Sequence, residues 1–120
     1  MDIHIINWVK KLGAAWVNKK PNLIPPLFAD KFQYFESPFE KPYTSKEDLI
    51  KLWSDVPKSQ KNISFDFEVI FIKDNIGLIH WCAAFTRIPF NKKAWLDGIF
   101  YLEFDKNNLC ILFKQWWVSK

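Results

Sequence analysis

Two polar side chains separated by one residue are the first candidates for chemistry. Tyr34 and Glu36 lie in the aromatic segment FQYFES, which has the pattern of a β-strand ended by Pro38. Side chains alternate across a strand, so Tyr34 and Glu36 share one face. A carboxylate in an apolar environment has a raised pKa and can act as a general acid or base. The alternative is that Glu36 forms a salt bridge at the rim of the fold.

A second carboxylate, Asp97, lies inside an otherwise apolar segment of the chain. Such a group is either paired with a cation, from Arg87, Lys114 or His80, or held in a cavity. Arg87 is the only arginine, and its planar guanidinium suits bidentate pairing with a carboxylate. We therefore expect Asp97 to pair with Arg87 or, in an enzyme, to face inward and tune Glu36.

Other catalytic and cofactor motifs are missing from the sequence. The three glycines form no phosphate-binding loop, and His4 and His80 have no metal-ligand spacing with the cysteines. Cys82 and Cys110 lie in apolar runs without a CxxC motif, which predicts buried free thiols. The sequence therefore predicts neither a cofactor nor a metal.

Charge and composition narrow the class of protein. The 120 residues, 49% of them apolar and 18% aromatic, can build the core of one domain spanning residues 1–120. The 17 basic residues exceed the 13 acidic ones, but the lysines are scattered, which argues against a nucleic-acid surface. The N-terminus is too short and too polar for a signal peptide or membrane span, so we expect a cytoplasmic protein without membrane partners.

The elements that must position these residues follow from periodicity. Apolar residues from Ile5 to Trp16 recur at helical spacing, with Asp2 as a cap and Pro21 as a stop. Prolines permit only a short helical turn over residues 26–30 before the first strand. A second helix starts at a capping box of Thr44 and Glu47. It ends before Pro57, and four strands follow as an antiparallel meander over residues 63–72, 78–87, 94–105 and 109–118.

The order of the local motifs resembles one superfamily. LFADKFQYFESPF, TSKEDLIKLW, HWCAAFTR, LDGIFYLEFD and FKQWW follow one another as in the SnoaL-like branch of the nuclear-transport-factor-2-like superfamily. The resemblance implies an α+β cone, in which N-terminal helices pack on a strongly curved antiparallel sheet and enclose a pocket. It covers nearly the whole chain.

The resemblance also implies which side chains line the pocket. The strand positions and the aromatic content predict a ligand-binding wall of Tyr34, Trp53, Trp81, Gln115 and Trp117. In the epoxide hydrolases of this superfamily, an Asn stands where this chain has Glu36 and an Asp where it has Gln115. The ketosteroid isomerases carry their Asp base where this chain has Ser37. The catalytic sets of these branches are therefore incomplete here, and Glu36 with Asp97 is the candidate catalytic pair.

Two functions remain open from the sequence. The first is a small pocket protein that binds a small hydrophobic molecule, or isomerises, cyclises or hydrolyses it. The second is a non-catalytic, homodimeric interaction or ligand-binding domain, and whether the protein is an enzyme is left open. A homodimer through the outer sheet face is expected because Ile70 and Ile72 interrupt the polar alternation of their strand. A basic-surface binding module is the weaker third idea.

Overall fold

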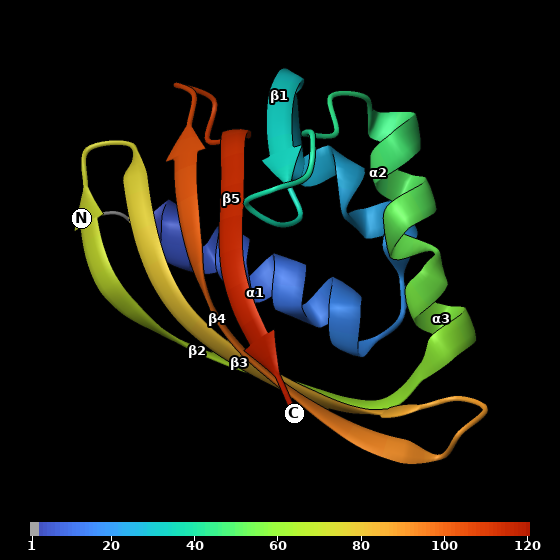
Figure 1. Cartoon of the computed structure of the whole chain (residues 1–120). Coiled ribbons are helices and arrows are strands. Elements are labelled where there is room, and N and C mark those ends of the chain that lie inside the picture. The colour runs from blue at the N-terminus through green and yellow to red at the C-terminus, as the bar shows by residue number, and fades with distance from the viewer. Residues whose placement is uncertain (1–2) are drawn as a thin grey trace.

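The computed structural model describes residues 3–120 and shows the predicted α+β fold (Figure 1). The expected cap at Asp2 lies outside the described residues. The helical elements are α1 (Ile3–Val17), the 3-10 turns η1 (Pro21–Leu23) and η2 (Pro25–Leu27), α2 (Lys46–Trp53) and α3 (Asp55–Ser59). The strands are β1 (Phe28–Phe35), β2 (Gln60–Lys73), β3 (Ile76–Arg87), β4 (Lys92–Phe104) and β5 (Cys110–Ser119).

The five strands form one mixed sheet in the order β1-β5-β4-β3-β2. The four C-terminal strands are an antiparallel meander, as predicted, but β1 pairs parallel with β5. The expectation of a wholly antiparallel sheet is therefore wrong at this edge. The reason is the connection: helices separate β1 from β2, so no hairpin dictates the direction of β1. Figure 1 shows the strongly curved sheet wrapping around α1, with α2 and α3 beside its open end.

Helix α1 packs against the concave face of the sheet through one apolar stripe. Its buried side chains are those that recur at helical spacing: Ile5, Trp8, Val9, Leu12, Ala15 and Trp16. The Trp8 indole donates a hydrogen bond of 2.7 Å to the backbone oxygen of Leu27, which fixes the helix to the turn before β1. The packing of this stripe therefore fixes the position of α1 on the concave face of the sheet.

Two local expectations, on a helix cap and on the turn before β1, differ from the structure. Helix α2 is capped by Ser45, whose side chain accepts a hydrogen bond from the Asp48 backbone N–H at 3.1 Å, and not by Thr44. Helix α2 ends before Pro57, as predicted, and Pro57 lies in the first turn of the short helix α3, where it displaces no helical hydrogen bond. The turn expected over residues 26–30 ends at Leu27, and β1 begins at Phe28.

Irregular pairing changes which side chains of β2 face outward. The register shifts between Val69 and Phe71, so two residues of β2 oppose one residue of β3. Beyond this bulge the side-chain parity is reversed. Ile72 therefore packs against the core, while Ile70 and Phe71 are about half exposed. Ile72 was expected on the outer face and that expectation is wrong.

The side chains of β3 alternate between the inner and outer faces of the sheet, and this alternation corrects the expectation for one cysteine. Cys82 is exposed on the outer face, contrary to the expectation of a buried thiol, whereas Cys110 is buried. Trp81 and Ala83, on either side of Cys82, are buried on the inner face. The apolar run in the sequence hid this alternation, because a small Cys fits either face.

Gly13 allows the closest approach between α1 and the sheet. A Cβ atom at this position would lie 2.4 Å from Cδ2 of Phe65, a ring packed against Trp16 and Trp81. Alanine favours a helix over glycine by roughly 1 kcal/mol, but overpacking a core costs about 1–3 kcal/mol. The steric cost is therefore expected to win.

We predict that Gly13→Ala lowers the free energy of unfolding by up to about 2 kcal/mol, measured by urea denaturation. The control is Ala14→Gly at the adjacent exposed position, which tests helix propensity without packing. It should lower stability by roughly 1 kcal/mol. If Gly13→Ala instead stabilises the protein, Phe65 does not press against the helix as described.

Candidate functional site

A cavity of about 360 Å³ lies between the concave sheet face and the helices. Every strand contributes to its wall, as do the ends of α1, α2 and α3. The structure places on this wall all five residues expected to bind ligand, as well as Glu36. The full lining consists of Trp16, Tyr34, Glu36, Leu52, Trp53, Asp55, Val56, Gln60, Trp81, Phe85, Arg87, Leu96, Phe100, Phe113, Gln115 and Trp117.

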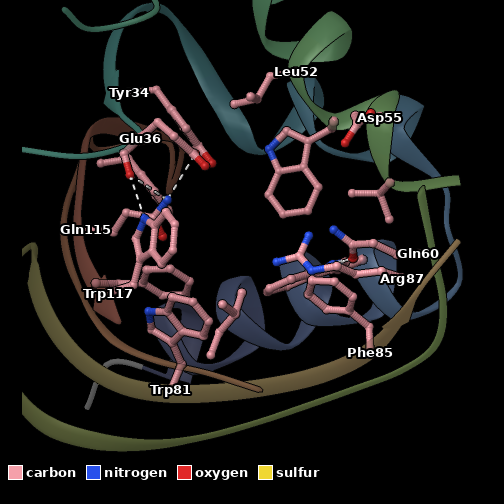
Figure 2. A pocket seen from close by; sticks show the side chains of 16 residues that line it. Tyr34, Glu36, Leu52, Asp55, Gln60, Trp81, Phe85, Arg87, Gln115 and Trp117 are labelled. Atoms are coloured by element: carbon pink, nitrogen blue, oxygen red, sulfur yellow. Dashed lines mark hydrogen bonds between the residues drawn. The ribbon is translucent and has the colours of Figure 1, made fainter. Parts of the chain in front are cut away.

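Glu36 is held at the end of β1 by side chains from β5. The amide Nε2 of Gln115 donates to the Glu36 carboxylate at 3.0 Å and to the Glu36 backbone oxygen at 3.1 Å. The Trp117 indole donates to the same backbone oxygen at 3.1 Å. Figure 2 shows these bonds on one side of the cavity. Among residues 3–120 Glu36 makes no salt bridge, so the expected alternative of an ion pair at the rim is not what the structure shows.

Burial sets the electrostatics of Glu36. Desolvation raises the pKa of this carboxyl to about 7, while interaction with the Tyr34 hydroxyl and the Gln115 amide opposes the rise. At neutral pH both the acid and the carboxylate are therefore populated. Burial, followed by the charge of Glu36, raises the pKa of Tyr34 well above its ordinary value, so Tyr34 stays a neutral hydroxyl.

An aromatic cluster forms the floor between the polar groups. The ring of Trp81 stacks on Phe100 with centroids 5.0 Å apart, and Trp16 meets the edges of Trp81 and Trp53. Gly98 leaves room for this arrangement, because a Cβ there would lie 2.8 Å from Trp81 and 2.6 Å from the Trp116 oxygen. The indole N–H of Trp81 is buried without a partner among the described residues, and the indole of Trp53 interacts with the Tyr34 hydroxyl. Such a free donor favours an occupant that carries acceptor atoms.

The opposite side of the cavity carries two polar residues that the sequence analysis did not assign to it. Gln60 and Arg87 are direct cross-strand partners at the start of β2 and the end of β3. Figure 2 shows both side chains directed into the cavity, across from Glu36 and Gln115. Parity was the available signal, since Arg87 lies on the face of its strand that also carries Trp81.

Asp97 lies on the outer face and is not brought together with Glu36. Its carboxylate hydrogen-bonds His80 Nε2 at 2.9 Å, and Glu68 contacts His80 Nδ1 at 2.7 Å. These two bonds, with the one to Glu68 first, raise the pKa of His80. Of the three cations considered for Asp97, His80 is its partner. The expectations of a pair with Arg87 and of an inward-facing partner of Glu36 are both wrong. The reason is alternation: Gly98 faces inward, so its neighbour Asp97 faces outward.

Clusters of metal ligands and membrane-spanning helices are both absent from residues 3–120. No cluster of three or more His, Cys, Asp or Glu side chains in this part of the chain could hold a metal ion. None of the helices described there is long and apolar enough to cross a membrane.

Comparison with known proteins shows similarity in structure alone. No family model and no curated protein matches the sequence. A provisionally assigned isomerase from Bacillus subtilis is similar with a TM-score of 0.83 at 15% identity, over 96% of this chain and 86% of that one. The epoxide hydrolase/cyclase-like enzyme SalBIII, from pyran ring formation in salinomycin, gives 0.79 at 8% identity, over 93% and 88%.

The description of a third similar structure states its fold. The structure is that of a Catenulispora acidiphila protein with a ketosteroid isomerase-like fold, in complex with trimethylamine, with a TM-score of 0.77 at 14% identity over 91% of this chain and 83% of that one. Identities this low establish the fold and leave the reaction open. The chain therefore has the SnoaL-like, nuclear-transport-factor-2-like cone fold that the order of its motifs predicted.

The raised pKa of Glu36 predicts a pH-dependent stability. In the unfolded chain this group titrates near 4.5 and in the folded protein near 7, so folding favours its protonated form. The contribution of protonated Glu36 to the free energy of unfolding is fully present below about pH 4.5 and is lost as the pH rises through about 7. Since each pKa unit corresponds to about 1.4 kcal/mol, the loss is about 3 kcal/mol.

The measurement compares urea unfolding of wild type and Glu36→Gln at about pH 5 and about pH 8. The variant should gain about 2–3 kcal/mol relative to wild type over this interval, because Gln cannot ionise. The difference between the two proteins cancels the titration of other groups. Parallel pH profiles would show that the pKa of Glu36 is not raised.

Proposed function

We propose that this protein binds a small, largely apolar molecule in the cavity and catalyses a proton transfer on it, with Glu36 as the general acid or base. The single observation that carries the proposal is a carboxylate oriented by Gln115 inside an aromatic cavity, with a pKa near neutrality. A general acid–base catalyst is most effective when its pKa lies near the working pH. The cavity volume suits a ligand of a few fused or linked rings.

The arrangement favours an isomerisation over a hydrolysis. Of the described residues, only Glu36 and Asp55 bring carboxylates to the cavity wall, and Asp55 is exposed at the first position of α3. A single base can remove a proton from one atom of the substrate and return the same proton to another, which balances without a co-reactant. The neutral Tyr34 hydroxyl, adjacent to Glu36, can orient the substrate. The similar structures include an assigned isomerase and a cyclase-like enzyme, which supports chemistry of this class.

The test begins with molecules retained in the purified protein, identified by mass spectrometry, and continues with turnover of related ketones and enol ethers. Glu36→Gln should lower kcat by roughly 100-fold or more, because the amide keeps the hydrogen-bond geometry but transfers no proton. Binding should remain within a few-fold of wild type. Full activity in this variant would exclude Glu36 as the acid or base, and binding without turnover in wild type would favour the non-catalytic alternative.

We also propose a homodimer through the outer face of the sheet. Apolar side chains gather there on β2, β4 and β5, including Ile70, Phe71, Trp95, Trp116 and Val118, with exposed fractions of 46% to 70%. Acidic Asp66 and Glu68 lie on the edge strand β2, on one side of this outer face, and basic Lys114 lies on β5, toward the other side, while Asp97 lies between them on β4. A twofold axis parallel to the strands would set the acidic side of one copy over the basic side of the other.

The dimer predicts a mass of twice the 14.4 kDa of one chain in light scattering at micromolar concentration. Trp116→Glu should convert the protein to a monomer, because it buries a charge at the centre of the apolar patch. The matched control is Lys51→Glu, a charge reversal on the exposed side of α2, which should leave the mass unchanged. A monomeric wild type would refute the proposed interface.

A further inference from the structure

We propose that the natural ligand of the cavity is an anion, a small apolar carboxylic acid or its equivalent, whose charged end is bound by Arg87 and Gln60 across the cavity from Glu36. The inference rests on the proposed function, since it concerns the same cavity. It adds the chemical class of the ligand and the direction in which the ligand lies.

Arg87 is a cation without an anionic partner in the described part of the chain. Among residues 3–120 no carboxylate oxygen lies within ion-pair distance of its guanidinium, although Asp55 lines the same cavity. The guanidinium instead lies 5.3 Å from the ring centroid of the buried Phe85, and Arg87 itself is an exposed residue that lines the cavity. Its planar donor set therefore remains available and is suited to bidentate binding of a carboxylate.

Gln60 supplies a second donor beside Arg87. Its side-chain oxygen accepts a hydrogen bond of 2.8 Å from the Trp16 indole, so the orientation of the amide is fixed. With the oxygen engaged, the Nε2 group is the part of the side chain left to bind a ligand in the cavity. Because Gln60 and Arg87 are cross-strand partners, their donors lie next to each other on the inner face. Two adjacent donor groups without an acceptor are the recognition chemistry of an anion.

The rest of the cavity orients such an anion. When Glu36 is ionised, its carboxylate repels a second negative charge from its own side of the cavity. Between the two ends the wall is aromatic, with Trp81 and Phe100 stacked along the floor. A ligand with one charged end and an apolar body therefore fits in one direction only, with its uncharged end presented to Glu36. That end would carry the atoms between which a proton moves.

The experiment uses two probes of nearly equal shape, cinnamate and its uncharged amide cinnamamide, at about pH 7 and low ionic strength. Binding is followed by two-dimensional NMR of the full chain labelled with nitrogen-15, in which the indole N–H signals of Trp16, Trp53 and Trp81 report entry into the cavity. Cinnamate should bind roughly 10-fold more tightly than cinnamamide, a difference of about 1.4 kcal/mol. Arg87→Gln should abolish that preference and leave cinnamamide affinity unchanged.

Two further variants separate local charge from other effects. Arg87→Lys keeps the charge but loses the planar donor pair, so it should retain part of the preference. Lys106→Gln removes one positive charge in the exposed β4–β5 turn, away from the cavity, and should bind both probes as wild type does. Its signals also control for the effect of net charge on association.

The outcomes distinguish the inference from the function on which it rests. If both probes shift the indole signals with equal affinity in wild type, the cavity binds ligands but the anionic class is wrong. The inference is also overturned if Arg87→Gln weakens both probes equally while its spectrum shows an intact fold. If neither probe shifts an indole signal at millimolar concentration, both the inference and ligand binding in this cavity are refuted.

Discussion

The parallel pairing of β1 with β5 is the contact on which the site depends. It brings Glu36 against Gln115, 79 positions further along the chain, just beyond the last pair of that ladder. Gln115 is 7% exposed, and a buried amide is tolerated only when its polar atoms are satisfied. Its Nε2 group bonds both the backbone and the carboxylate of Glu36, so the same contact holds the end of the edge strand β1 in place and orients the acid in the cavity.

Separation of charge across the cavity gives each end a distinct role. An arginine within about 4–6 Å of a carboxylate typically lowers its pKa by 1–3 units. Arg87 does not contribute to the pKa of Glu36, which burial dominates. The aromatic floor between them has two effects: it desolvates the acid, and it keeps the cation on the opposite wall. A direct pair between these residues would neutralise both and leave neither an acid near neutrality nor an anion site.

Alternation along strands made part of the site predictable from the sequence. Tyr34 with Glu36, and Trp81 with His80 on the opposite face, follow from a period of two. What alternation cannot supply is the pairing between strands and its irregularities. The position of Asp97 depends on the register that sets it diagonal to His80, and Ile72 turns inward because of a bulge. The parallel direction of β1 is likewise fixed by tertiary contacts, since no hairpin joins it to a neighbouring strand.

Gly98 shows why the inner and outer faces of this sheet cannot vary independently. On the inner face its missing side chain makes room for the ring of Trp81, and the Trp116 backbone oxygen lies too close for a Cβ atom. The strand that provides this gap must point its next residue outward, which places Asp97 beside His80 and the exposed side chains of the outer face. A shift of one residue in β4 would fill the cavity floor and bury a carboxylate at once. The register that opens the cavity is therefore the same register that builds the charged outer face.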